Sequence, residues 1–389
     1  MVTWLALPAL AAAAYYLLAI IAAIQWGKAR DRRNPPTPRL PVSILKPVHG
    51  RNARFYEAIR SHAAQDYPEF EMIFGVSDPG DPALEDIERL QREFPHRSIR
   101  VFPVSTQAPN IKAGVLAALA KHARWPLMLV NDGDILVDPG YLDAVTGPLA
   151  DPHVGMTTCL YRATGESWAA RWEALGIATE FAPSVMVARL VGVAEFALGA
   201  TMVFRAEQLR EAGGFEAIAD YLADDYRLGR LISERGYRIA FAPAVVETDL
   251  GDESWAGMWR HQLRWSRTIR VSRPSGYYGY VVAQATVWAI LAFAAGLWWA
   301  GAAAAGLRML AAYLVGVRVL QDRNVKRFFG MIPLRDLFGF AVWAGGIFGA
   351  KVHWRGQKLR LSRDGKIRRL RELPAKSGKQ SAKDKGAAR

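Results

Sequence analysis

Apolar residues are concentrated in two uncharged segments near the ends of the chain. Residues 1–27 carry no charge and are rich in Leu, Ala and Ile, and residues 281–320 contain only two charged side chains. A helix of about 20 apolar residues crosses the ~30 Å hydrocarbon layer of a bilayer. We therefore predict a membrane anchor over 1–27 and a hairpin of two spans over 281–320, with its turn near Gly296, Gly301 and Gly306.

A cleaved signal peptide is the alternative for the first segment. Such a peptide carries its positive charge before the apolar core. Here the positive charge follows the core, at Lys28, Arg30, Arg32, Arg33 and Arg39. This order favours an uncleaved anchor, and by the positive-inside rule it predicts that the following domain faces the cytoplasm.

A third apolar segment is too short to assign by length. Residues 337–350 are uncharged but only fourteen long, so an interfacial or re-entrant helix within 331–350 competes with a full span. The first alternative leaves the basic segment 351–389 in the cytoplasm as a tail, whereas a fourth span would export it. We favour the interfacial or re-entrant helix.

Between these segments, residues 40–250 alternate between short apolar runs and helical patterns. Strands are expected at 41–45, 70–76, 99–104 and 127–130, and helices at 52–65, 82–94 and 111–123. This alternation predicts an α/β catalytic domain built on a parallel sheet with helices on both faces. Ligands of such sheets bind beyond the carboxyl ends of the strands.

Acidic residues lie at those predicted strand ends. Asp78, with Asp81 nearby, follows the strand at 70–76, and Asp132 and Asp134 follow the strand at 127–130. No glycine-rich phosphate loop of the dinucleotide or P-loop type is present. The Asp132-Gly133-Asp134 sequence is suited to a hard divalent cation that shares its coordination with substrate phosphates. The alternative is a simple turn, because Asp-Gly is a strong turn signal.

A further pair of carboxylates, Asp224-Asp225, lies on an amphipathic helical pattern. Adjacent helical positions point to different faces, so one of the two is expected to enter a site. Asp225 is the candidate general base for a hydroxyl acceptor, and an ordinary acidic first helical turn is the alternative. No second carboxylate stands out as the nucleophile that a retaining transfer requires.

Net charge adds information about partners. Residues 351–389 contribute a net charge of +11 to the chain's net charge of +14. We predict that this basic tail is attracted to an anionic membrane surface, and nucleic-acid binding is the disfavoured alternative. Cys159 is the only cysteine, so one chain can form no disulfide, and the histidines lack the spacing of a zinc site.

Taken together, the motifs of residues 40–280 resemble a known family. The order of acidic residues and the closing His261-Gln-Leu-Arg264-Trp265 run resemble the inverting family-2-type glycosyltransferases. Shorter matches resemble, more narrowly, the ceramide glucosyltransferase family (family 21) and its bacterial relative in hopanoid biosynthesis. These matches are Lys46-Pro-Val-His-Gly50, Asp78-Pro-Gly-Asp-Pro82, Asn110-Ile-Lys112, Gly199-Ala-Thr-Met-Val-Phe-Arg205, Gly213-Gly-Phe215 and Leu222-Ala-Asp-Asp-Tyr226.

The resemblance implies a GT-A-type, Rossmann-like mixed sheet in one catalytic domain, with transmembrane helices on both sides and a motif-bearing interfacial segment at 251–280. It also implies a role for each motif residue. Asp225 would be the catalytic base, and Asp132 and Asp134 would hold the donor diphosphate through Mg²⁺ or Mn²⁺. The donor itself would be contacted by Asp78, Lys112, Asp132, His261, Arg264 and Trp265.

Two departures concern the acceptor. His261 stands where the family has Gln or Arg, and Phe181-Ala182-Pro183 stands where animal ceramide glucosyltransferases carry a His before a Pro. The apolar stretch from Trp168 to Leu198 is a candidate acceptor groove or, equally, ordinary core.

We therefore expect a multi-pass enzyme, in a bacterial inner membrane, that moves one glucose or N-acetylglucosamine from a UDP-sugar to a lipid hydroxyl. The lipid would be ceramide-like or a hopanoid. A processive polysaccharide synthase and a non-catalytic membrane scaffold are the alternatives.

Overall fold

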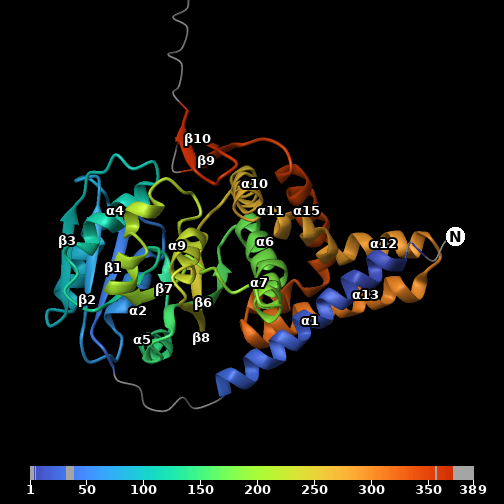
Figure 1. Ribbon diagram of the computed structural model, residues 1–389, viewed down its shortest axis with the longest axis horizontal. Coiled ribbons are helices and arrows are strands. Elements are labelled where there is room, and N and C mark those ends of the chain that lie inside the picture. The colour runs from blue at the N-terminus through green and yellow to red at the C-terminus, as the bar shows by residue number, and fades with distance from the viewer. Residues whose placement is uncertain (1–3, 5, 32–38, 355–356, 371–389) are drawn as a thin grey trace, which may run out of the picture.

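The computed structural model describes residues 4, 6–31, 39–354 and 357–370, and Figure 1 shows its two parts. A mixed eight-stranded sheet flanked by helices forms one part. A set of long helices projects from it and includes the first helix of the chain. Strand order in the sheet is β3-β2-β1-β4-β7-β6-β8-β5.

Half of this sheet is parallel and follows the predicted alternation of strands and helices. Strand β1 pairs in parallel with β2 and β4, and β2 pairs in parallel with β3. Every residue of β1, β2 and β4 is buried, as expected for strands covered on both faces. The elements are β1 (Val42–Val48), α2 (Phe55–Ala63), β2 (Phe70–Val76), α3 (Ala83–Glu93), β3 (Ser98–Pro103), α4 (Ile111–Ala120) and β4 (Leu127–Val130).

The other half makes the sheet mixed. Strand β7 (Met202–Arg205) is antiparallel to both β4 and β6 (Val154–Thr164). Strand β8 (Arg238–Asp249) runs parallel to β6 and antiparallel to β5 (Ile135–Leu136). Residue pattern alone predicted a parallel sheet, and the mixed sheet implied by the family resemblance is the one observed.

Helices and short turns connect these strands. They are α5 (Tyr141–Thr146), η2 (Gly147–Ala150), α6 (Trp168–Gly176), the π-helical segment η3 (Ile177–Phe181), α7 (Ala182–Leu190), α8 (Ala206–Glu211), η4 (Phe215–Ile218) and α9 (Asp224–Ser233). Helix α9 begins with the two adjacent carboxylates. The segment from Trp168 to Leu190 is therefore helical, and its first helix, α6, packs against β6.

Two helices of the described chain are long and apolar enough to cross a membrane, Ala6–Arg30 in α1 (Ala6–Asp31) and Trp298–Val319. The second consists of α13 (Trp298–Ala312) and the π-helical segment η6 (Tyr313–Val319). Helix α12 (Ala285–Ala294) turns back into α13 at Gly296, which has a φ of +74°.

Small side chains allow these helices to approach closely. Ala9 of α1, Ala292 of α12 and Ala304 of α13 are all fully buried in one cluster. Small residues at helix contacts are typical of membrane helices, where packing replaces the hydrophobic driving force. Figure 1 shows α1, α12 and α13 lying together away from the sheet.

The first arm of the predicted hairpin is not a straight span. Residues Pro274–Ala283 and Ala285–Ala294 form two apolar segments that meet at 45°. The first segment comprises α11 (Pro274–Gly279) and η5 (Tyr280–Ala283), and it follows α10 (Trp255–Ser272). The described chain therefore has two candidate spans, or three if the bent pair is counted as one.

Residues 323–346 return to the body of the protein as α14 (Arg323–Arg327), η7 (Phe329–Met331) and α15 (Ile332–Gly346). Helix α15 is buried on several sides, including at Arg335 and Asp336. Asp336 forms a bidentate ion pair with Arg308 of α13 at 2.6 and 3.1 Å. Thr286 of α12 donates to the same carboxylate at 2.5 Å. One carboxylate thus joins three helices.

The basic tail expected from residue 351 is partly folded. Strands β9 (Lys351–Trp354), β10 (Gln357–Leu361) and β11 (Ile367–Arg369) form an antiparallel sheet. Leu359 and Ile367 pack with Leu222, just before α9. The apolar positions of β10 alternate with charged ones, and this alternation stabilises a strand that composition alone did not indicate. The rest of the predicted tail, residues 371–389, lies outside the described chain.

Removing the Asp336 carboxylate tests the helix arrangement. Asp336→Ala would leave the Arg308 charge buried without its partner, which costs about 3–5 kcal/mol in comparable buried pairs. We expect a large drop in the thermal unfolding midpoint of the detergent-purified protein.

Two further variants complete this test. Arg308→Leu/Asp336→Leu should recover much of the loss, because no charge remains buried. Arg230→Gln removes an exposed pair with Glu234 and should cost less than about 1 kcal/mol. Equal midpoints for Asp336→Ala and Arg230→Gln would contradict the buried pair.

Candidate active site

The buried ammonium of Lys112 joins two of the acidic clusters. Lys112 lies in the first turn of α4, where Asn110 caps the helix by accepting from the Ala113 amide at 3.1 Å. Its Nζ lies 2.8 Å from Asp132 Oδ1 and 3.6 Å from Asp224 Oδ2. Burial by itself lowers the pKa of Lys112, but the two carboxylates outweigh it and raise the pKa. Lys112 is therefore a fixed positive charge.

Asp134 directly precedes β5 and is held by the neighbouring strand β8. The Thr248 hydroxyl of β8 donates to Asp134 Oδ2 at 2.6 Å. Burial, and then the negative charge of Asp132, raise the pKa of Asp134. Neighbouring carboxylates that repel one another are stabilised by a shared cation.

These two aspartates fit a divalent metal only if the substrate completes the coordination. Among the residues that the structure describes, no group of three or more His, Cys, Asp or Glu side chains is arranged to hold a metal. Mg²⁺ is commonly bound through one or two carboxylates together with substrate phosphates. The donor set at Asp132 and Asp134 is of that kind.

Asp225 of α9 is held by backbone amides. Its carboxylate accepts from the Gly199 amide at 2.9 Å and from the Tyr226 amide at 2.7 Å. A Cβ at Gly199 would lie 3.2 Å from Asp225 Oδ2, which explains why glycine occupies that position. Burial, and then the neighbouring Asp224, raise the pKa of Asp225 to about 6. The carboxyl group is thus poised to gain and lose a proton near neutral pH.

The predicted closing motif lies on α10, and its side chains are half-buried. Burial lowers the pKa of Arg264 to about 10, while the carboxylates of Glu173, Asp224, Asp132 and Asp225 oppose that change. Arg264 is therefore, after Lys112, a second positive charge whose electrostatics these acids influence.

His261 and Trp265 lie one helical turn apart, with their rings edge to face at 4.9 Å. His261 Nδ1 is 2.6 Å from Glu173 Oε1 of α6. Trp265 contacts Phe181, with 5.8 Å between ring centroids. The unusual histidine of the motif therefore has a buried carboxylate partner that fixes its ring.

The sequence motifs assigned no role to three further residues, Tyr161, Glu173 and Lys46. Burial, and then the negative charges of Asp225, Glu173, Asp132 and Asp134, raise the pKa of Tyr161 in β6. Glu173 orients His261. Lys46, at the start of the quoted Lys46–Gly50 motif, donates to the Asp132 backbone carbonyl at 3.2 Å. Burial lowers the pKa of Lys46 to about 7.

Asp78 does not join this cluster. It is exposed after β2, and its Oδ1 accepts from the Gly80 amide at 2.9 Å. No hydrogen bond or ion pair connects it to the cluster within the described chain. Asp81 holds the same loop by accepting from the Gly50 and Ala83 amides. Because β2, β1 and β4 run parallel, Asp78 lies at the same edge of the sheet as Asp132, with β1 between their two strands.

A mixed sheet with clustered carboxylates and cations at its carboxyl edge defines a protein with the GT-A-type fold. A mannosyltransferase from Pyrobaculum calidifontis, solved in complex with GDP-Man and Mn²⁺, has a similar fold. Its TM-score is 0.53 at 18% identity, and the match covers 88% of this chain and 99% of the other. The chain belongs to glycosyl transferase family 21, whose family model matches residues 2–367.

Relatives of known name agree with this membership. Ceramide glucosyltransferase 1 of Caenorhabditis elegans is 27% identical over 58% of this chain and 49% of its own length. Ceramide glucosyltransferase 3 of the same organism is 28% identical over 52% and 44%. The probable glycosyltransferase YdaM of Bacillus subtilis is 23% identical over 58% and 54%. The chain thus spans about half the length of the curated relatives that it matches.

The raised pKa of Asp225 predicts a pH profile. A base acts in its ionised form, so kcat/KM for the acceptor, at saturating donor, should fall by about tenfold for each unit of pH below about 6. Transfer rates measured between pH 5 and 8 test this. Asp225→Asn should lose this acid limb, and a wild-type profile that stays flat down to pH 5 would contradict the assignment.

Proposed function

We propose that this protein is a membrane-bound, inverting glycosyltransferase that moves one sugar from a UDP-sugar to a lipid hydroxyl. The observation that carries this proposal is the bridge from Asp132 through Lys112 to Asp224. This bridge brings a metal-candidate pair and a candidate base to one edge of the sheet. Family membership supports the reaction class.

The diphosphate of the donor would lie between the aspartates and the cations. Mg²⁺ or Mn²⁺ on Asp132 and Asp134 would supply positive charge for the departing nucleotide diphosphate. Lys112 and Arg264 would add fixed positive charge on the protein side. Electrostatic stabilisation of this kind is a large part of catalysis when charge develops on a leaving group. We keep Asp78 as a proposed contact to the uridine-sugar, at the outer end of the same edge.

Asp225 would take the proton from the acceptor hydroxyl. The adjacent Asp224 is tied to Lys112, which leaves one carboxylate of the pair for proton transfer. A single base with no carboxylate nucleophile fits direct displacement and inversion. His261, fixed by Glu173, and Trp265 would line the donor and acceptor space beside Tyr161.

A lipid acceptor is supported by the helices that surround the site. The α6–α7 segment packs against the candidate spans, and Phe181 in it contacts both Trp265 and Tyr161. An acceptor hydroxyl at the membrane surface could thus reach Asp225 from the apolar side. Ceramide-like lipids and hopanoids both present such a hydroxyl, and glucose and N-acetylglucosamine are the sugars that we propose.

We further propose that the catalytic domain faces the cytoplasm at a bacterial inner membrane. The charges that follow the first span support this orientation. The exposed basic residues of β9–β11 and the segment after them would then meet the anionic lipid surface. Nucleic acid is not part of this proposal.

Lipid analysis of cells that produce the chain tests the proposed reaction. Expression of the wild type should yield a new glycolipid whose mass exceeds that of a host lipid by one hexose or N-acetylhexosamine residue. Asp225→Asn should reduce this product by about 10²–10⁴-fold, the usual contribution of general base catalysis. The protein should still bind UDP, because Asp225 contacts the acceptor and not the donor.

Mass spectrometry of extracted lipids measures the product, and UDP binding to the purified variant is the control. Equal amounts of product from the wild type and Asp225→Asn would show that Asp225 is not the catalytic base. Absence of any added sugar on lipid, together with no hydrolysis of UDP-sugars by the purified enzyme, would overturn the proposed reaction.

A further inference from the structure

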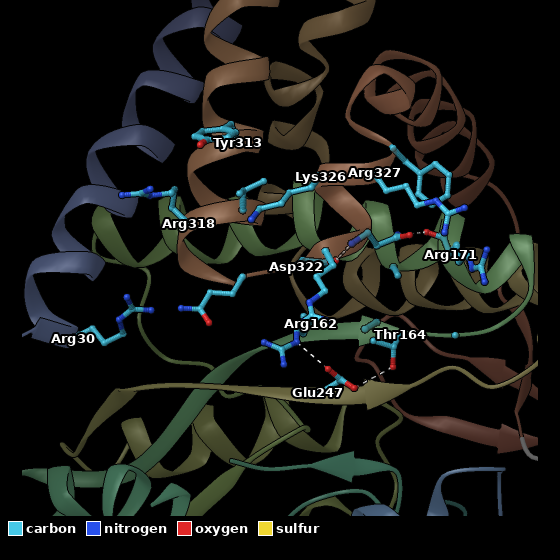
Figure 2. Close-up of a pocket in the computed structure, with 18 residues that line it drawn as sticks. Arg30, Arg162, Thr164, Arg171, Glu247, Tyr313, Arg318, Asp322, Lys326 and Arg327 are labelled. Carbon is cyan, nitrogen blue, oxygen red and sulfur yellow. Dashed lines mark hydrogen bonds and ion pairs between the residues drawn. The ribbon is translucent and has the colours of Figure 1, made fainter. Parts of the chain in front are cut away.

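A polar cavity lies between the candidate membrane spans and the catalytic sheet. Its volume is about 980 Å³, which falls within the range of about 300–1,000 Å³ common for small-molecule sites. Figure 2 shows Arg30 of α1 at one end, Arg171 of α6 at the other, and Lys326 and Arg327 above the pair of Arg162 and Glu247. We call this space the basic cavity.

The lining of the basic cavity is strongly positive. Seven arginine or lysine side chains line it against two carboxylates, those of Glu247 and Asp322. Glu247 is already compensated, because Arg162 and Arg54 contact it at 2.9 and 2.7 Å. Within the described chain, Arg318, Arg323 and Lys326 have no hydrogen-bond or ion-pair partner. The positive charges of these three side chains are therefore not paired within the described chain.

The wall of the cavity is locally irregular. The second candidate span ends there in the π-helical segment η6. Such segments within helices are often found at functional sites. Gln321 follows it at a φ of +54°, the only non-glycine residue with positive φ among those described. Strain of this kind persists where the surrounding structure enforces it, frequently at ligand sites.

Asp322 supplies a separate indication of a ligand. It lines the cavity and is only 3% exposed, and its Oδ1 accepts from the Asn324 amide at 2.7 Å. Its Oδ2 is buried and has no hydrogen-bond partner in the described chain. A buried acceptor without a donor is costly. A bound group that carries a hydroxyl or ammonium donor would satisfy it.

The position of the cavity identifies the source of the ligand. Arg30 and Arg318 belong to the ends of the two candidate spans, so the cavity lies where both helices leave the apolar layer. Lipid headgroups occupy that level. We propose that the basic cavity binds the phosphate of an anionic membrane lipid, whose headgroup hydroxyl reaches Asp322. This lipid is distinct from the acceptor, since the cavity lies outside the Lys112-centred cluster.

The floor of the basic cavity and the candidate metal site share one strand. Glu247 of β8 faces the cavity, and the next residue, Thr248, donates to Asp134. Successive residues of a strand point to opposite faces. A headgroup held on one face would therefore brace the strand that positions Asp134 on the other.

Native mass spectrometry of the full-length protein in detergent micelles tests this site directly. Phosphatidylglycerol, with phosphatidylcholine as the comparison lipid, is titrated into the wild type and into Arg318→Gln/Lys326→Gln. We expect one retained phosphatidylglycerol on the wild type, and affinity at least about tenfold lower in the variant because two charge-assisted contacts are lost. Lys121→Gln/Arg210→Gln, which removes two exposed charges elsewhere, should bind as the wild type does.

Three outcomes would overturn the proposal. These are equal retention by the wild type and Arg318→Gln/Lys326→Gln, an equal loss in the control variant, or no preference over phosphatidylcholine. Inorganic phosphate forms a separate arm: if it raises the thermal midpoint of the wild type as much as phosphatidylglycerol does, the lipid source is wrong. Equal midpoints of the lipid-free variants and wild type show that folding is intact. Sugar transfer is not measured, so the result stands apart from the proposed reaction.

Discussion

The ion pairs of the buried Lys112 are the interaction on which the site depends. Without a cation between them, the buried carboxylate of Asp224 and the carboxylate of Asp132 would have no Lys112 charge to offset their repulsion. Burial of such charges is tolerated only when they are paired and hydrogen-bonded. Lys112 thereby fixes the end of β4 against the start of α9. The candidate donor side and the candidate base are held together by one ammonium group.

A second set of polar contacts connects this site to the helices near the membrane. Glu173 accepts from His261 and Gln262 of α10, and Gln262 in turn accepts from Arg335 of α15 at 3.0 Å. Arg335 also lies 3.2 Å from Glu180 at the end of η3. The His261 substitution in the closing motif is thus matched by Glu173. These contacts connect the α10 motif to the helices near the membrane.

The parallel half of the sheet could be predicted from the sequence because the signals for its strands are local. The runs that became β1 to β4 are short, apolar and separated by helical patterns, so neighbouring residues sufficed to locate them. Asp132 and Asp225 were recognisable for a similar reason: each follows or begins an element with a clear pattern.

Residues brought to the site by distant pairing had no such local signal. Tyr161 lies in the middle of a long strand, and Glu173 in an apolar helix, where nothing in the nearby pattern marks either one. Their place follows from the pairing of β6 with β8 and from the packing of α6 on α10. The C-terminal sheet was missed for a different reason. Its high charge concealed the alternation of Leu359 and Leu361 with charged neighbours.

The central claim is that the cluster around Lys112 holds a metal and a nucleoside diphosphate together. Isothermal titration calorimetry of UDP into the full-length, detergent-purified protein tests it most directly. UDP should bind in the presence of Mn²⁺ or Mg²⁺, lose most of its affinity in EDTA, and bind weakly to Asp134→Asn under all conditions. Equal UDP affinity with Mn²⁺ and with EDTA, or binding that is unaffected by Asp134→Asn, would contradict the account.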